Sequence, residues 1–178
     1  MKVNIKKLAV SAMLTAVAVS LSGFSIPIGA SKCFPIQHLA NVLAGVFLGP
    51  WYGVGMAFCT SFIRNLMGTG SLLAFPGSMV GAFLGGDLYQ RFGRLTLAYF
   101  GEVFGTGILG GMLCYPVATL VMGKEAAIFA YVIPFLMSTM CGTVIAAFLI
   151  GVLYKSGAFQ YMRRMLDLDV QTGKAMGR

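Results

Sequence analysis

The apolar residues of this chain are gathered into long continuous runs, and no other feature constrains its fold as strongly. A transmembrane helix needs roughly 20 consecutive apolar residues, and a chain of 178 residues holds about six such spans joined by short loops. The runs are continuous, whereas the strands of a transmembrane barrel alternate between apolar and polar positions. We therefore predict an all-α integral membrane protein, a compact bundle of six transmembrane helices. The predicted spans are residues 8–28, 36–50, 51–67, 71–92, 95–122 and 126–154.

The boundaries of these runs leave some alternatives open. The chain is only 10% charged, against about 25% in an average soluble domain. The second and third runs are short for a full crossing and are separated by a turn at Gly49 and Pro50, so they are either tilted or partly re-entrant. The first run follows three lysines, as a secretory signal does, but it is longer than a signal core and no A-x-A cleavage pattern comes after it. We interpret it as the first transmembrane helix.

The basic residues predict the orientation of the bundle. Cytosolic loops of membrane proteins carry an excess of Lys and Arg. With six spans and a cytosolic N-terminus, ten of the 13 basic residues fall on the cytosolic side: Lys2, Lys6, Lys7, Arg91, Arg94, Lys155, Arg163, Arg164, Lys174 and Arg178. The other three, Lys32, Arg64 and Lys124, fall outside. We therefore predict that both termini are cytosolic (N-in/C-in).

A polar stretch between the first two runs is the first candidate binding site. It contains Lys32, Gln37, His38 and Asn41. Pro35 suits the first turn of a helix, and from there Gln37 and Asn41 are one turn apart, so their side chains project from one side. Polar groups inside a membrane are costly and usually mark sites. We predict a pocket for a small polar heteroaromatic ligand; helix capping and headgroup contact are the alternative.

A second polar group lies one apolar run later, at Arg64 and Asn65, followed by a glycine-rich loop, residues 68–71. Arg64 either contacts a ligand or extends to the outer interface. Three aromatic residues are further candidates for the pocket: Phe75, which can stack on a ligand ring, and Tyr115 and Tyr131, for which interfacial anchoring is the alternative. Pro76 predicts a kink in the fourth helix.

Two stripes of small residues and two acidic residues complete the candidates. Gly77, Gly81 and Gly85 repeat every four residues, which predicts close helix packing. The stripe of the first helix either packs internally or docks a partner; it consists of Ala12, Ala16 and Ser20. We interpret both Asp87 and Glu102 as ion-pairing groups at the inner interface, with Arg91 or Arg94 as the partner of Glu102; a proton site or a contact with a partner protein is the alternative for Glu102.

Several functions are excluded or disfavoured. The chain has no G-x-x-x-x-G-K-[ST] motif for ATP, and its basic residues form no aromatic-interleaved face for nucleic acid. One histidine and four scattered cysteines predict no metal site and no cofactor, and we expect the cysteines within the apolar runs to be buried free thiols. Two alternatives to a binding subunit remain: a small membrane enzyme with His38 as base and Arg64 as electrostatic partner, and a helix-packing protein without a ligand.

The motifs together resemble one family. Lys32…Pro35-x-Gln37-His38-x-x-Asn41 is followed by Leu48-Gly49-Pro50, Arg64-Asn65, Gly68-Thr69-Gly70 and Leu73-Ala74-Phe75-Pro76-Gly77-Ser78. This combination resembles the ThiW family, substrate-binding S components of energy-coupling factor (ECF) vitamin transporters. The resemblance covers roughly residues 1–155, which we therefore expect to be the substrate-binding membrane domain, with residues 156–178 as a basic cytosolic tail.

The resemblance implies a function and partners. It implies a non-enzymatic subunit in the cytoplasmic membrane of a prokaryote that captures the thiamin precursor hydroxyethylthiazole from outside the cell. A transmembrane coupling protein and two ATPase subunits would supply the energy. The larger class docks its first helix on the coupling protein through an A-x-x-x-A pattern, and Ala12-x-x-x-Ala16 stands in that place. An S component for a pyrimidine or for another vitamin remains the alternative.

Overall fold

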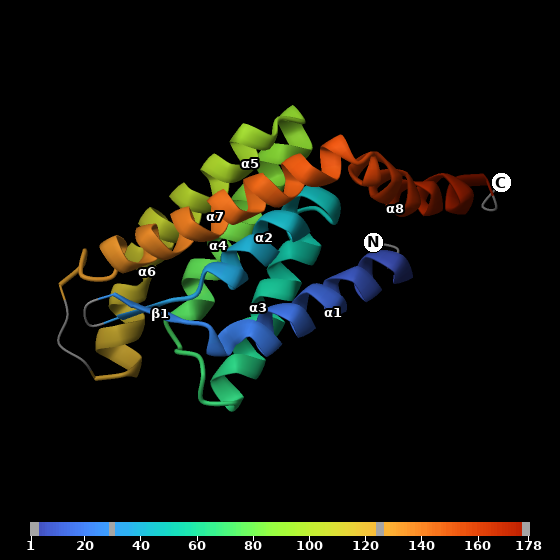
Figure 1. Ribbon diagram of the computed structural model, residues 1–178. Helices are drawn as coiled ribbons and strands as arrows, with labels where there is room; N and C mark the ends of the chain where they lie inside the picture. The colour runs from blue at the N-terminus through green and yellow to red at the C-terminus, as the bar shows by residue number, and fades with distance from the viewer. Residues whose placement is uncertain (1–3, 29–30, 124–126, 176–178) are drawn as a thin grey trace.

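The computed structural model describes residues 4–28, 31–123 and 127–175, which form an elongated bundle of helices (Figure 1). The first helices are α1 (Ile5–Ser20), which ends in a 3₁₀ turn, η1 (Leu21–Gly23), then α2 (Pro35–Phe47), α3 (Pro50–Leu66) and α4 (Ala74–Phe92). A long helix follows, composed of α5 (Leu95–Glu102), η2 (Val103–Gly110), α6 (Gly111–Pro116) and η3 (Val117–Val121). The last helices are α7 (Val132–Lys155) and α8 (Ala158–Ala175).

Local sequence signals explain where several helices begin and end. Pro35 and Pro50 occupy the first positions of α2 and α3, where the missing N–H of proline costs no hydrogen bond. The Asn4 side chain caps α1 by accepting from the N–H groups of Lys6 and Lys7. Gly93 ends α4 with φ of 66°, a conformation that residues with a Cβ adopt at a cost.

Each of the predicted apolar runs contains one continuous helix, and the structure corrects three details. The end of the first run is not helical: β1 (Ile26–Ile28) pairs antiparallel with β2 (Ser31–Cys33) in a short hairpin. The last of these helices begins at Val132 rather than near residue 126, which lies outside the described residues. The predicted kink at Pro76 is wrong, because α4 begins at Ala74 and the first four N–H groups of a helix have no intrahelical partner.

Three of the described helices are long and apolar enough to cross a membrane: Ile5–Gly23, Leu95–Val121 and Val132–Lys155. With 13 and 17 residues, α2 and α3 are shorter than a typical crossing of about 20 residues. This is a membrane protein by the composition of these helices. A count of six crossings and the N-in/C-in orientation stay predictions.

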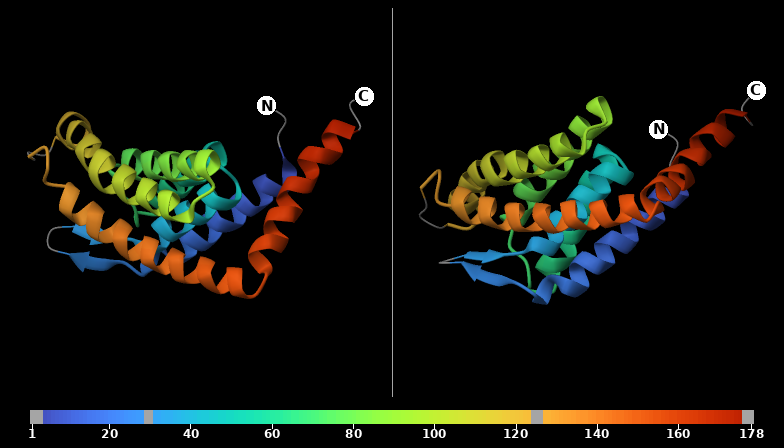
Figure 2. Two further views of the ribbon diagram at one scale, coloured as in Figure 1. Left: turned by 90° about the horizontal axis from the view of Figure 1, so that it is seen from above. Right: turned by 45° about the horizontal axis from the view of Figure 1, so that its top comes forward.

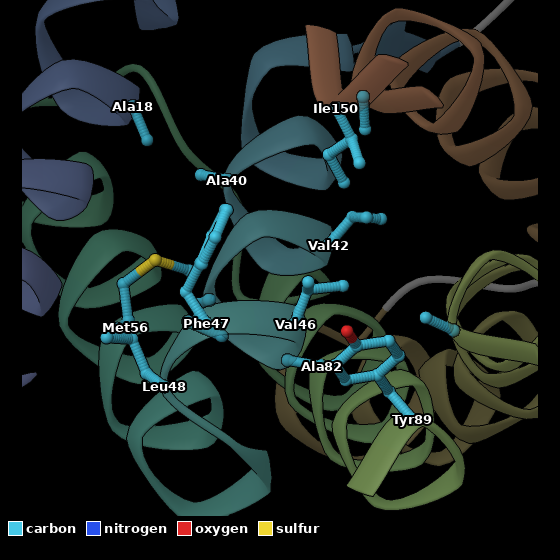
Figure 3. Packing of buried hydrophobic residues seen from close by; sticks show 14 of the residues in the cluster. Ala18, Ala40, Val42, Val46, Phe47, Leu48, Met56, Ala82, Tyr89 and Ile150 are labelled. Atoms are coloured by element: carbon cyan, nitrogen blue, oxygen red, sulfur yellow. The ribbon is translucent and has the colours of Figure 1, made fainter. Parts of the chain in front are cut away.

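The central helix of the bundle is α2, which packs against α3, α4 and α7. Val46 and Phe47 of α2 join Met56 of α3, Tyr89 of α4 and Ile150 of α7 in the apolar core (Figure 3). The polar residues of the first half of α2 are buried as well, which places them inside the protein rather than at a lipid interface. Burying them requires partners, because an unpaired polar group in apolar surroundings is costly.

The glycine stripe of α4 packs against glycines of the following helix, which confirms the packing prediction. A Cβ added at Gly101 would lie 2.7 Å from the Cα of Gly85, and one at Gly105 would lie 2.8 Å from the Cα of Gly81. Real Cβ atoms do not come this close to backbone, so only glycine permits this approach. The close packing brings Glu102, which lies between the two glycines, against α4.

The residues after Tyr154 form a helix, α8, which the sequence did not lead us to expect. It leaves the end of α7 at an angle (Figure 2). Phe159 and Leu166 are buried, and the Phe159 ring lies 5.2 Å from that of Phe47. The Nδ2 of Asn4, before α1, is 3.4 Å from the carbonyl oxygen of Leu166, so α8 also lies beside the start of the chain. Its proposed position in the cytosol stays a prediction.

Candidate functional site

A cavity of about 500 Å³ lies where α2, α4 and α7 begin and α3 ends, together with the loop after α3. Its polar lining comes from Gln37, His38, Arg64, Thr69, Ser71, Ser78 and Ser138. Three aromatic side chains also line it: Phe34, Tyr131 and Phe135. The mixture of aromatic walls and a few convergent polar groups is typical of a small-molecule site, and the volume falls in the usual range of about 300–1,000 Å³.

Arg64 is a buried cation in the lining of this cavity, with 1% of its surface exposed. Its guanidinium carbon lies 3.8 Å from the centroid of the Phe34 ring. Nη1 donates a hydrogen bond to the side-chain oxygen of Gln37, and Nη2 donates to the carbonyl oxygen of Thr69 at 3.2 Å. The guanidinium has no carboxylate partner among the described residues. Its charge is therefore balanced by dipoles and a ring face, which leaves it able to attract an electron-rich ligand group.

The orientation of Gln37 is fixed by its two neighbours. Its Nε2 donates to the hydroxyl of Ser61 at 3.1 Å, while its oxygen accepts from Arg64. The Ser61 hydroxyl is in turn 3.2 Å from that of Ser78, which donates to the carbonyl oxygen of Ala74 at 2.7 Å. This chain of hydrogen bonds joins α2, α3 and α4 beneath the cavity and holds its floor in one arrangement.

The loop after α3 is held by the end of that helix. The N–H groups of Thr69 and Gly70 both donate to the carbonyl oxygen of Arg64, at 3.0 and 2.9 Å. The side chain of Asn65 donates to the carbonyl oxygens of Ser61 and Ser71, at 2.8 and 3.1 Å. A Cβ at Gly70 would lie 2.9 Å from the nitrogen of Asn65, so glycine is required for this tight return. Asn65 therefore shapes the wall of the cavity from behind.

His38 is paired with an acidic residue far away in the sequence. Its Nδ1 lies 3.0 Å from Oε1 of Glu102, and both side chains are buried. The same Oε1 accepts from Nδ2 of Asn41 at 3.0 Å and from the hydroxyl of Thr106 at 3.1 Å. Helix α2 and the helix that contains α5 and η2 are thus joined by a buried polar cluster directly behind the cavity.

The structure places four of the predicted site residues in the lining of the cavity: Gln37, His38, Arg64 and Tyr131. Asn41 lies behind the lining, on Glu102 and the carbonyl oxygen of Ser78. Contact of any of these residues with a ligand stays a prediction.

The other predicted site residues lie elsewhere. Asn65 holds the loop. The Phe75 ring lies 5.6 Å from that of Phe58, an exposed residue of α3, and neither Phe75 nor Tyr115 lines the cavity. The backbone of Lys32 pairs with Pro27 in the hairpin, but its side chain lies outside the described part of the structure. Asn65, Phe75 and Tyr115 are thus not part of the cavity lining, and their contact with a ligand stays an untested prediction.

The interpretation of Glu102 as an interfacial ion-pairing group is wrong. Glu102 is 1% exposed and its ionisable partner is His38 rather than Arg91 or Arg94. The signal that could have found it is a carboxylate between Gly101 and Gly105, because a glycine face indicates a helix side turned toward a neighbour. The ion pair expected of Asp87 is confirmed, since its carboxylate lies 2.8 Å from Nε of Arg91, one turn later, and its position at the inner interface stays a prediction.

Sequence reasoning also missed Phe34 and Ser138. Phe34 packs its ring on Arg64, and its N–H donates to the hydroxyl of Ser138 at 2.8 Å. Nothing in the sequence pairs a residue before α2 with one in the middle of the last long apolar run. Their contact depends on the way α7 crosses α2, where a Cβ at Gly142 would lie 2.6 Å from Cβ of His38.

The small-residue stripe of α1 lies on an exposed face. Ala12, Ala16 and Ser20 are exposed, whereas the neighbouring Ser11, Thr15 and Ala18 are buried against the bundle. Internal packing, one of the two alternatives for this stripe, is therefore wrong within this chain.

The cysteines and the possible metal ligands carry no further site in the described part of the chain. The four cysteines are free, and no group of three or more His, Cys, Asp or Glu residues is placed to hold a metal ion among the residues described. Cys114 is buried as expected, but Cys59 and Cys141 are exposed, because they lie on the outer faces of α3 and α7.

Comparison with known families gives one match. The family model described as Thiamine-precursor transporter protein (ThiW) matches residues 8–156, which include every helix from α2 to α7 and the whole cavity. A search of curated proteins finds no match. ThiW is a family of transporters rather than of enzymes, which removes the alternative of a membrane enzyme. Its match to most of the chain, together with the apolar helices, shows that this membrane protein belongs to the ThiW family of thiamine-precursor transporters.

Proposed function

We propose that the chain is the substrate-capture subunit, or S component, of an ECF importer and that it binds hydroxyethylthiazole in the cavity between α2, α3, α4 and α7. The observation that carries the proposal is the cavity itself, in which the buried guanidinium of Arg64 and the imidazole of His38 lie among aromatic walls. The ligand of this proposal is a small ring compound that offers an aromatic face and a few polar atoms. Its aromatic face matches the aromatic walls of the cavity, and its polar atoms match the guanidinium and the imidazole.

The distribution of charge supports an outward-facing cavity. Basic residues gather at the opposite end of the bundle: Lys7 in the first turn of α1, Arg94 just before α5, Lys155 at the end of α7 and Arg163 within α8. Arg64 lies at the cavity end, and it is buried in the site. By the excess of basic residues in cytosolic loops, the cavity end is the outer end. A ligand then enters from outside the cell.

The exposed stripe of α1 supports a partner inside the membrane. Small side chains such as Ala12 and Ala16 let the backbones of two helices approach closely, and helix association in lipid depends on this packing. The chain has no G-x-x-x-x-G-K-[ST] motif for ATP, and in this proposal the energy for uptake comes from other subunits. In the proposed complex, a transmembrane coupling protein docks on this stripe and two ATPase subunits drive transport.

The binding of thiazole can be tested with the purified protein in nanodiscs. Calorimetric titration with hydroxyethylthiazole is expected to show saturable binding, and an aminopyrimidine of similar size is expected to bind much more weakly. Asp87→Asn is a control variant and is expected to bind as the wild type does, because it removes a carboxylate whose partner is Arg91, away from the cavity. Tight binding of the pyrimidine with none of the thiazole would replace the thiazole by the pyrimidine as substrate. Binding of neither compound would contradict the proposal.

A further inference from the structure

The hydrogen bonds of the buried Glu102 carboxylate determine which nitrogen of His38 carries the hydrogen. Three groups meet its Oε1: Nδ1 of His38, Nδ2 of Asn41 and the hydroxyl of Thr106, at 3.0, 3.0 and 3.1 Å. Its other oxygen, Oε2, has no hydrogen-bond partner among the described residues. A Cβ at Gly81 would lie 2.8 Å from Oε2, so the fold keeps room for the carboxylate at this position.

The position of each hydrogen follows from the partners. Nδ2 of Asn41 also lies 3.2 Å from the carbonyl oxygen of Ser78, which only accepts, and this contact fixes which end of the amide faces Glu102. Oε1 therefore accepts from Asn41 and also from Thr106. An oxygen that already accepts twice is a carboxylate or carbonyl oxygen rather than an acid hydroxyl. The hydrogen between Oε1 and His38 consequently belongs to Nδ1.

The second ring nitrogen of His38 faces the cavity. The ring lines the cavity, and Nε2 has no hydrogen-bond partner among the described residues. Nε2 is also not among the fully buried polar atoms that lack a partner, so it is open to the cavity. When Nδ1 carries the hydrogen in a neutral imidazole, Nε2 has a lone pair and accepts. Neutral histidine in water favours the opposite form, with the hydrogen on Nε2, so the pairing with Glu102 reverses the ordinary preference.

The charges of the site favour a neutral imidazole. Among the described residues, the buried Lys, Arg, Asp and Glu side chains are one cation, Arg64, and one anion, Glu102. With neutral His38 these charges cancel, whereas an imidazolium would leave a net positive charge in an apolar protein. Uncompensated buried charge is strongly unfavourable.

We propose that Glu102 is a positioning residue that holds His38 in the Nδ1–H form, so that Nε2 accepts a hydrogen bond and the cavity selects ligands that carry a donor, such as a hydroxyl or N–H group. For the identity of the ligand this inference rests on the proposed function. In hydroxyethylthiazole the donor is the hydroxyl group. Arg64, which only donates, then donates a hydrogen bond to an acceptor atom of the ligand. His38 thus recognises a donor of the ligand, and Arg64 recognises an acceptor.

The form of His38 can be observed directly because it is the only histidine of the chain. We would label histidine with ¹⁵N and record nitrogen spectra of the ligand-free protein in nanodiscs near neutral pH. The expected spectrum shows one protonated nitrogen, Nδ1, and one unprotonated nitrogen, Nε2. Protonation of both nitrogens, or of Nε2 alone, would overturn the inference. This readout does not depend on the identity of the ligand.

Two variants separate the hydrogen bond of Glu102 from its bulk and charge. Glu102→Met removes the acceptor, and we expect the Nε2–H form to appear. Glu102→Gln keeps an oxygen that can accept from Asn41, Thr106 and His38, and we expect it to preserve the Nδ1–H form. If Glu102→Met fails to fold, the wild-type spectrum still decides the form of His38, and loss of the Nδ1–H form in Glu102→Gln would contradict the role of Glu102. A wild-type spectrum in Glu102→Met would also contradict the role of Glu102.

Ligand selection is measured with hydroxyethylthiazole and its methyl ether, which keeps the ring but lacks the donor. In the wild type and in Glu102→Gln, the alcohol is expected to bind about tenfold more tightly than the ether, the effect of one buried hydrogen bond. In Glu102→Met this ratio is expected to fall close to one. Equal binding of alcohol and ether by the wild type would overturn the inference, whereas binding of neither would contradict the proposed function and leave the ¹⁵N result to stand.

Discussion

The guanidinium carbon of Arg64 lies 3.8 Å from the centroid of the Phe34 ring, and this contact joins the end of α3 to the residue that precedes α2. A desolvated cation over an aromatic ring is worth about 2 kcal/mol, more than at an exposed site. The ring therefore supplies part of what a carboxylate would otherwise supply to a buried arginine. It also leaves the donors of Arg64 for Gln37, Thr69 and a ligand.

The coupling between these two residues can be measured with a double-mutant cycle. Phe34→Leu and Arg64→Met are each expected to lower the free energy of unfolding in detergent, by about 1–3 kcal/mol, because each leaves buried groups without a partner. The double variant should lose about 1–2 kcal/mol less than the sum of the single losses. Additivity within about 0.5 kcal/mol would show that the ring does not stabilise the guanidinium.

The glycine contact between α4 and α5 predicts a position-specific cost. A Cβ at Gly101 would lie 2.7 Å from two backbone atoms of Gly85, which no side-chain rotation can relieve. Gly101→Ala is therefore expected to destabilise the protein by about 1–3 kcal/mol, measured by thermal unfolding in detergent. Gly151→Ala in α7 is the control, because nothing lies within 4 Å of its Cβ position, and its better helix propensity should leave stability unchanged or slightly raised. Equal effects at the two positions would contradict this packing.

The exposed face of α1 predicts a defect in assembly without a defect in binding. Ala12→Leu places a bulky side chain on the stripe and is expected to weaken co-purification with the coupling protein and ATPases at least about tenfold, while affinity for the ligand is unchanged. Met13→Leu, on the same exposed side of α1 and already large, is the control and should assemble normally. Undiminished assembly of Ala12→Leu would exclude this stripe as the docking surface.

Orientation in the membrane can be tested with single cysteines. In a chain whose native cysteines are replaced by alanine, Leu72→Cys marks the exposed loop at the cavity end, and Ser156→Cys marks the exposed end of α7. A membrane-impermeant thiol reagent added to intact cells is expected to label Leu72→Cys and not Ser156→Cys. The reverse pattern would turn the cavity toward the cytosol and contradict capture from outside.

The helices were predictable from sequence, because continuous apolar runs and the turn signal at Gly49 and Pro50 act locally. The glycine stripe of α4 was predictable for the same reason, since its spacing of four residues is a property of one helix. The hairpin at Ile26–Ile28 was not, because three apolar residues extend a helical run as naturally as they form a short strand. The helix after Ser156 carries mixed polar residues and gave no apolar run to follow.

The candidate site was predictable only in part. Gln37 and His38 each lie about one turn of α2 from Asn41, and this spacing predicts that the three side chains project from one side of the helix. The partners of Gln37 and His38, Ser61 and Glu102, lie 24 and 64 residues away, and only the packing of the helices brings them together. Local reasoning gave Glu102 the nearest cations as partners and Phe75 a ligand ring. The first inference could not include the packing of α2 against α5, which brings Glu102 to His38, and the second could not include the proximity of Phe58.

The central claim is that this cavity holds a thiazole, and the small molecule released from the protein tests it most directly. The protein would be purified under mild conditions from cells supplied with hydroxyethylthiazole, denatured, and its released compounds identified by mass spectrometry. A matched variant, Ala74→Phe, fills the cavity from the start of α4 without removing any of its polar side chains. We predict that the wild type releases hydroxyethylthiazole in near-stoichiometric amount and that Ala74→Phe releases little. Equal release from both proteins, or release of a different compound from the wild type, would contradict the account.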